Sequence, residues 1–135
     1  TGGLVAHRVC LVPGASDFFH GGVVTYTDGV KHRELGVPTE LLEKFGAVSD
    51  PVARAMAEGV RARFGTDLAV ATTGFAGPTG GTETDPVGTA YVALAHKAGT
   101  EVTRYGWLGT RYEVMSRTAK LALNMVRLRL MTTAG

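Results

Sequence analysis

The chain of 135 residues has little cysteine, few aromatic residues and no long apolar run. Its one cysteine, Cys10, excludes an internal disulfide framework and fits a reducing compartment. Because Cys10 lies in an apolar stretch, we interpret it as part of the core rather than as a nucleophile. No apolar run reaches transmembrane length and no signal peptide is visible, so we expect a cytoplasmic protein without a membrane partner.

An excess of charge of one sign is also missing. Fourteen basic and twelve acidic residues give a net charge of +2, and the basic residues are scattered along the chain. This distribution shows no nucleic-acid footprint. The histidines lack paired ligand spacing, so we expect neither a metal nor a cofactor. The four histidines are His7, His20, His32 and His96.

Glycine, in contrast, is abundant, with 19 residues. Many of these glycines cluster, which indicates backbone-lined loops rather than general flexibility. The longest such segment, residues 74–88, follows a short apolar stretch. It is not a P-loop, because no lysine follows its glycines, and it carries no dinucleotide-binding fingerprint. Its amides could approach an anion or a carbonyl group, and a long crossover with turn glycines is an equally good interpretation.

Helix and strand signals alternate along the chain. The helices are predicted at residues 3–12, 30–35, 39–45, 50–64 and 110–131. The strands are predicted at residues 22–27, 68–73, 88–95 and 102–108. Apolar residues spaced four apart predict the buried stripe of the 50–64 helix, and Gly65 is expected to end that helix. Thr110 and Glu113 fit a capping box at the start of the last helix.

Helices separate the first two predicted strands, and a hairpin joins the last two. This order is typical of a three-layer α/β/α domain with a mixed sheet. The first helix lacks the strand that such a fold places before it. We therefore predict a sheet of about five strands, of which the first is missing from this chain.

Tyr26 and Lys31 form the first candidate for chemistry, because the tyrosine ends a predicted strand and the lysine lies in the first turn of a helix. A phenol and an ammonium held together lower one another's proton affinity and can act as a base. A half-buried strand tyrosine and a solvated lysine are the more common interpretation. The junction of a strand and a helix is, however, where α/β proteins place ligands.

Three further sites are candidates for ligand binding, and each also has a purely structural interpretation. Thr1 and Gly2 directly precede a helix, so their amides could bind an anion, or they could simply form a glycine-rich approach. Ser16 is a turn serine that could donate a hydrogen bond if it faces the site. Arg111 begins the last helix, where it is either surface charge or within reach of a phosphate.

Several segments together resemble the CinA C-terminal domain family, which includes the nicotinamide-nucleotide amidases. The matching segments cover nearly the whole chain in order. They are TGGLVA (1–6), PGAS (13–16), GVVTY (22–26), LGVP (35–38), GAVS (46–49), TGFAGP (73–78), PVGT (86–89) and GTR (109–111).

This resemblance implies hydrolysis of the carboxamide of nicotinamide mononucleotide to nicotinic acid mononucleotide and ammonia, a step of pyridine nucleotide salvage and NAD metabolism. The family's opening motif, Glu-Ser-Cys-Thr-Gly-Gly, would place a nucleophilic serine two residues before Thr1. Tyr26 and Lys31 would activate that serine, and Ser16 with the amides near Thr1 would stabilise the oxyanion. Arg111 would lie near the phosphate. The residues that would hold the nucleotide are Thr73, Gly74, Phe75, Ala76, Gly77 and Pro78.

The chain departs from the family pattern at four positions. Thr27 and Asp28 replace the usual Ser-Asn, Gly29 replaces a glutamate, and Thr110 replaces an aspartate. Asp28 adds a negative charge that would raise the proton affinity of Lys31 if the two are close. These departures concern catalytic efficiency more than fold.

We thus interpret residues 1–135 as one amidase domain, incomplete at its N-terminal end, that binds a small nucleotide. A homo-oligomer and an additional N-terminal domain in the full protein are further expectations from the resemblance. The first alternative is a non-catalytic nucleotide-binding or oligomerising module of a larger CinA-type protein. The second is an interaction protein linked to competence or stress.

Overall fold

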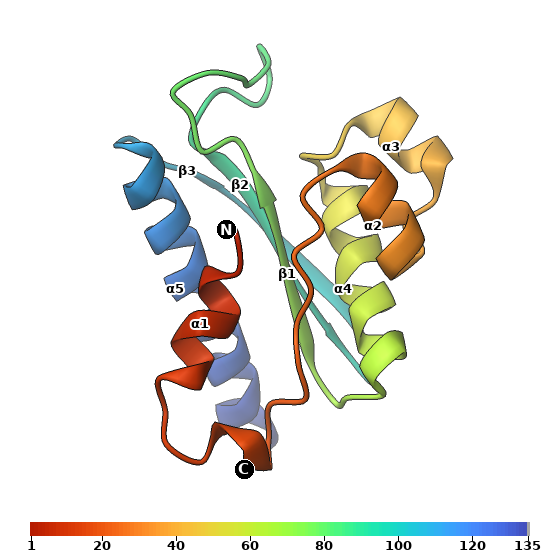
Figure 1. Cartoon of the computed structure of the whole chain (residues 1–135), viewed down its shortest axis with the longest axis vertical. Coiled ribbons are helices and arrows are strands. Elements are labelled where there is room, and N and C mark those ends of the chain that lie inside the picture. The colour runs from red at the N-terminus through yellow and green to blue at the C-terminus, as the bar shows by residue number, and fades with distance from the viewer. Residues whose placement is uncertain (135) are drawn as a thin grey trace.

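The computed structural model describes residues 1–134, so that Gly135, the last residue of the predicted domain, lies outside the described residues. The helices are α1 (Leu4–Cys10), the 3₁₀ turn η1 (Ala15–Asp17), α2 (Asp28–Leu35), α3 (Thr39–Phe45), α4 (Asp50–Phe64) and α5 (Arg111–Thr133). The strands are β1 (Ala69–Gly74), β2 (Thr89–His96) and β3 (Gly99–Gly106). Helices α1 and α5 lie on one side of the sheet, and α2, α3 and α4 lie on the other (Figure 1). The α/β prediction is confirmed.

The sheet differs from the prediction. Its order is β1-β2-β3, and both neighbouring pairs are antiparallel. Residues 1–134 thus form three antiparallel strands, and the predicted mixed sheet of about five strands is not confirmed. The reason lies in the connection after β1. Residues 75–88 cross over without a helix and return the chain beside β1 in the opposite direction, as an antiparallel neighbour requires.

Residues 22–27, predicted as a strand, are extended but belong to no sheet. A strand exists only where its backbone groups pair with a neighbour. Within the described residues, the amides of residues 20–26 donate no backbone hydrogen bond. The start of the chain lies between this segment and β1. A Cβ on Gly3 would touch Val24, and the hydroxyls of Thr1 and Thr72 are 3.0 Å apart.

Helix α4 forms the best-packed part of the molecule, because it contacts all three strands. Of its predicted stripe, Val52 and Met56 are buried, and Ala53 and Ala57 join them. Small residues of the sheet meet this face, and Gly65 ends the helix with φ +62°, as predicted. Burial of these side chains is the main source of stability on this side.

Helix α5 begins as its sequence predicts. The Thr110 hydroxyl accepts a hydrogen bond from the Glu113 amide, and the Glu113 carboxylate accepts one from the Thr110 amide at 2.7 Å. This reciprocal pair is a capping box, so the prediction is confirmed. The predicted hairpin is also confirmed, because β2 and β3 pair in register from Thr89 opposite Gly106 to His96 opposite Gly99.

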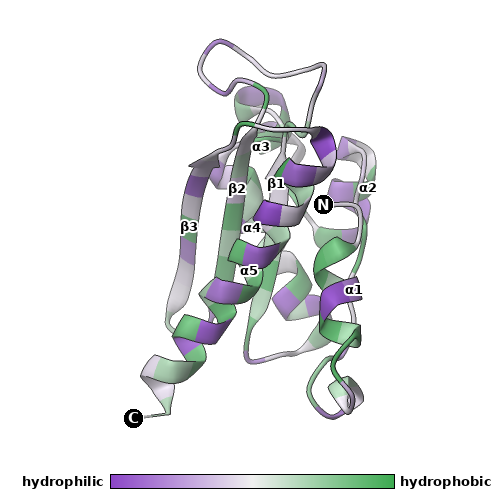
Figure 2. Cartoon of the chain, turned by 90° about the vertical axis from the view of Figure 1, so that its left-hand side faces the viewer, coloured by the Kyte–Doolittle hydropathy of each residue, from purple (hydrophilic) through white to green (hydrophobic). Residues whose placement is uncertain are grey.

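Helix α1 differs from α4 because none of its residues is buried. Cys10 is exposed, so its interpretation as part of the core is wrong. The chain that follows α1 also exposes apolar side chains, at Leu11, Val12 and Phe18. Figure 2 shows these hydrophobic stretches along α1 and the loop below it. None of the helices in residues 1–134 combines the length and the apolar character needed to cross a bilayer.

Candidate active site

Apart from Ser16, the predicted site residues come from four parts of the chain: the residues before α1, the start of α2, the end of β1 with the loop after it, and the start of α5. Thr27 is the N-cap of α2 and keeps an extended conformation, so Tyr26 precedes the helix directly. Lys31 follows within the first turn, where its amide donates to the Thr27 carbonyl oxygen at 3.0 Å. This local fold sets the phenol and the amine at the same end of α2.

Lys31 is buried, with 6% of its surface exposed. Its Nζ donates a hydrogen bond to the Thr25 carbonyl oxygen at 3.0 Å. Burial lowers the pKa of Lys31, and the nearby carboxylate of Asp28 opposes part of this effect by raising that pKa. The expected influence of Asp28 is therefore confirmed in direction. A buried amine with a lowered pKa gives up its proton more readily than an exposed lysine does.

Tyr26 is 72% exposed, and its hydroxyl is bound by Arg111 rather than by Lys31. One guanidinium nitrogen of Arg111 donates to Tyr26 Oη at 3.0 Å, and the other donates to the Gly77 carbonyl oxygen at 2.8 Å. Among the described residues, no hydrogen bond joins Tyr26 to Lys31. Arg111 thus links two predicted parts of the site, a role for which the sequence carries no signal.

The first residue lies close to both cations. The positive charges of Lys31 and Arg111 both act on the backbone nitrogen of Thr1. A cavity of about 30 Å³ opens beside Thr1, between the end of β1 and α5. This volume is close to that of one water molecule. Its lining residues are Thr1, Thr72, Thr73, Gly74, Ala76, Ala90, Val114, Met115 and Thr118.

The predicted nucleotide-binding loop begins at this cavity. Thr73 is buried, and its hydroxyl donates to the Ala47 carbonyl oxygen at 2.8 Å, so it is turned away from solvent. Gly77 is buried with φ +86°, and a Cβ there would overlap the side chain of Val87. Only glycine fits this position, where the backbone must approach its neighbour. Phe75 is half-buried and Pro78 is exposed.

Ser16 is not brought to these groups. It lies in η1, is exposed, and follows the opposite end of α1 from Thr1. Figure 1 places η1 at the far end of the molecule from the start of α5. In this arrangement Ser16 cannot act on a group bound beside Thr1. The sequence could not show this, because the rigid length of α1 separates the two positions.

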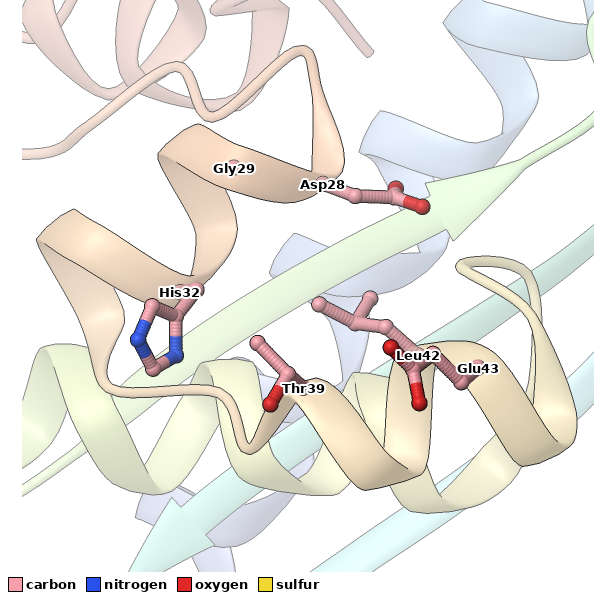
Figure 3. Close-up of a pocket in the computed structure, with 6 residues that line it drawn as sticks. All are labelled: Asp28, Gly29, His32, Thr39, Leu42 and Glu43. Carbon is pink, nitrogen blue, oxygen red and sulfur yellow. The ribbon is translucent and has the colours of Figure 1, made fainter.

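A larger cavity of about 230 Å³ lies between α2 and α3 (Figure 3). Tyr26, Lys31 and Arg111 line neither this cavity nor the smaller one. Two carboxylates face the larger cavity, which disfavours an anionic nucleotide, and the His32 ring nitrogen Nδ1 is bound to the Val37 carbonyl oxygen at 2.8 Å. The larger cavity is therefore a poor candidate for the predicted chemistry. The residues lining the larger one are Asp28, Gly29, His32, Thr39, Leu42 and Glu43.

Residues 1–134 contain no cluster of three or more His, Cys, Asp or Glu side chains that could hold a metal ion. The groups gathered at the site are an amine, a guanidinium, a phenol and threonine hydroxyls. Such groups bind anions and move protons.

The CinA C-terminal domain family matches residues 1–130 of this chain. A CinA-like protein of Gemmatimonas aurantiaca is 48% identical over 135 residues, which are 100% of this chain and 32% of that protein. A CinA-like protein of Geobacter sulfurreducens is 52% identical over 132 residues, 98% of this chain and 32% of that protein. The chain thus spans about a third of the length of these curated relatives.

Solved structures of similar proteins share this fold. The competence damage-inducible protein A of Klebsiella pneumoniae superposes with a TM-score of 0.92 at 33% identity, over 96% of this chain and 81% of that one. A competence/damage-inducible protein of Agrobacterium tumefaciens gives a TM-score of 0.88 at 38% identity, over 94% of this chain and 78% of that one. With a family match over nearly all its residues, this chain belongs to the CinA C-terminal domain family.

Proposed function

We propose that this chain carries the amidase site of a nicotinamide-nucleotide amidase, which hydrolyses nicotinamide mononucleotide to nicotinic acid mononucleotide and ammonia. The observation that carries the proposal is the buried amine of Lys31, whose charge acts together with that of Arg111 at Thr1. The nucleophile would be a serine two residues before Thr1, next to that amine. One free cysteine among the described residues fits a cytoplasmic location for this reaction.

The open edge of β1 supports a position for that serine. The Phe75 amide donates to the Thr89 carbonyl oxygen, so alternate residues of β1 turn their backbone groups away from β2. These residues include Val70 and Thr72, and the Thr72 hydroxyl lies 3.0 Å from that of Thr1. We propose that a further strand leads into Thr1 between β1 and residues 22–27. Such a strand would pair with both and bring the sheet to about five strands.

In the proposed reaction, neutral Lys31 takes the proton of the serine hydroxyl, and the serine oxygen bonds to the carboxamide carbon. The negative oxygen that forms is stabilised by the amides of Gly2 and Gly3, which donate to no backbone acceptor within residues 1–134. The carbon–nitrogen bond then breaks, and Lys31 returns its proton to the departing ammonia. Water hydrolyses the resulting ester.

Tyr26 is the partner of Lys31 in this proposal. Arg111 orients the exposed hydroxyl of Tyr26 by donating to its oxygen. The proton of that hydroxyl stays free to be donated or relayed toward the substrate. Arg111 has five N–H donors, and the bonds to Tyr26 and Gly77 leave others for the nucleotide phosphate. The loop that contains Gly77 would then lie against the nucleotide.

Ammonia release from nicotinamide mononucleotide tests the proposal, with the full-length gene product as the enzyme. We expect Lys31→Met to lower kcat by about a hundredfold or more, because proton transfer by a positioned group contributes on that scale. Methionine fills the buried site without a charge, so folding should be retained. Lys44→Met is the matched control, since Lys44 is an exposed lysine over the Phe45 ring and should leave kcat unchanged.

Turnover in Lys31→Met equal to that of Lys44→Met would remove Lys31 from the mechanism. A wild-type protein that binds the nucleotide without releasing ammonia would contradict the amidase proposal. It would favour instead a nucleotide-binding module of a larger CinA-type protein.

A further inference from the structure

The second half of the loop between β1 and β2 is fastened to the sheet by three side chains, which we call the Asp85 cluster: Asp85, Tyr91 and Arg104. The Tyr91 hydroxyl and the Arg104 Nε both donate to the same Asp85 carboxylate oxygen, each at 2.9 Å. Arg104 also donates to the Thr84 carbonyl oxygen at 3.0 Å. Tyr91 and Arg104 are direct partners across β2 and β3, so one cross-strand pair of the hairpin holds the loop.

The Asp85 cluster is better shielded than an ordinary surface ion pair. The Asp85 side chain is 19% exposed, and Tyr91 packs against the hydrophobic core. Burial, followed by its hydrogen bond to Asp85, raises the pKa of Tyr91, so the hydroxyl remains a donor. Shared and partly buried hydrogen bonds of this kind hold a backbone segment more firmly than an exposed pair does.

Close backbone contacts connect the Asp85 cluster to the active site. Gly77 fits against Val87, two residues after Asp85, and Gly81 lies directly against the backbone of residues 86–87. The Gly88 amide donates to the Phe75 carbonyl oxygen at 2.7 Å, which joins the two legs of the loop. Gly77 in turn accepts the hydrogen bond from Arg111, and Arg111 holds Tyr26.

We propose that Asp85 is a positioning residue for the substrate loop: it holds residues 75–88 where Gly77 meets Arg111. This inference rests on the proposed function. Within the described residues, Asp85 makes no hydrogen bond or ion pair with Tyr26, Lys31 or Arg111, so it acts through the loop. Loss of the Asp85 carboxylate should weaken nucleotide binding. The loop would no longer be ordered before the nucleotide binds, so part of the binding free energy would be spent on ordering it.

The test compares Asp85→Ala with Glu83→Ala in the full-length gene product. Glu83 is the matched control, because it lies in the same loop, is exposed, and makes no hydrogen bond or ion pair within the described residues. We expect Asp85→Ala to raise KM for nicotinamide mononucleotide about three- to tenfold, with kcat changed less than about twofold, since only loop order is lost. Asp85→Asn keeps an acceptor oxygen for Tyr91 and should restore part of the loss.

Hydrogen exchange of the loop amides separates this inference from the proposed function. We expect residues 76–88 to exchange faster in Asp85→Ala than in the wild type and in Glu83→Ala. Equal KM values for the two alanine variants would overturn the inference, even if both are active. If the wild type releases no ammonia, the proposed function fails. Loop exchange then still decides whether Asp85 holds the loop, and unchanged exchange overturns that as well.

Discussion

Helix α4 and the region around α1 differ sharply in how they are packed. On the α4 side, Val52, Ala53 and Ala57 are fully buried against the small residues of the strands. On the other side, α1 buries none of its residues, and the chain from Leu11 to Tyr26 leaves several large apolar side chains exposed. The groups that we assign to chemistry lie along the second region, at its border with the well-packed sheet.

The two regions therefore have different roles in the fold, one as a packed frame and the other as a place for binding. The α4 side supplies a rigid frame, because close packing leaves little freedom for its side chains. The region around α1 and residues 22–27 has unpaired backbone groups and open apolar surface, which are typical of a place where another segment or a ligand binds. Three predictions test this comparison, from the largest expected effect to the smallest.

The first prediction contrasts one leucine from each region. Leu35 in α2 is 7% exposed within the α4-side core, and Leu11 after α1 is 67% exposed. Leu35→Ala should lower the free energy of unfolding by about 2–5 kcal/mol, because it leaves a cavity in the core. Leu11→Ala should change that free energy by less than about 0.5 kcal/mol. Urea unfolding of the chain measures both. A large loss for Leu11→Ala would show that its region is packed after all.

The second prediction contrasts two glycines within helices. A Cβ on Gly59 of α4 would overlap the Leu35 carbonyl oxygen, where α2 crosses α4, whereas a Cβ on Gly29 of α2 would touch nothing. Gly59→Ala should therefore cost about 1–3 kcal/mol, because backbone must move. Gly29→Ala should stabilise by about 0.5–1 kcal/mol through helix propensity. Thermal unfolding gives the two signs. Equal signs would contradict this account of α2–α4 packing.

The third prediction concerns Lys31, the buried charge at the border. Its pKa in the folded protein lies below its ordinary value of 10.5, so the unfolded chain binds more protons between those two pKa values. The cost of burying the charge is complete below the folded pKa and disappears as pH rises toward the ordinary value. The stability of the wild type relative to Lys31→Met should therefore rise with pH in this window, by at most about 1.4 kcal/mol per pH unit. Urea unfolding at several pH values measures this slope, and a flat difference would contradict the lowered pKa.

The elements predicted best are those whose signals are local. The Thr110–Glu113 capping box, the end of α4 at Gly65 and the β2–β3 hairpin each depend on a few neighbouring residues, and all were predicted correctly. The buried stripe of α4 was predicted in its first half, because periodicity shows which face is apolar. It does not show how far the covering sheet extends, so Val60 and Phe64 are only half-buried.

The errors concern pairing over long distances. The composition of residues 22–27 suits a strand, yet no described strand lies beside this segment, so it joins no sheet. Ser16 resembles a site residue in the sequence, but α1 carries it away from Thr1. The bonds from Arg111 to Tyr26 and Gly77 join residues that are 85 and 34 positions apart, and no local pattern reports such contacts.

By itself, the sequence determined the helices, the hairpin, the α/β class and the family, because capping, periodicity and motif order are properties of neighbouring residues. Only the tertiary structure decided the antiparallel order of the sheet, the open edge of β1, the burial of Lys31 and the partners of Arg111. The same holds for the attachment of the loop by Asp85. The physical reason is that hydrogen-bond partners and desolvation depend on which distant segments meet, and these meetings are set by packing of the whole chain.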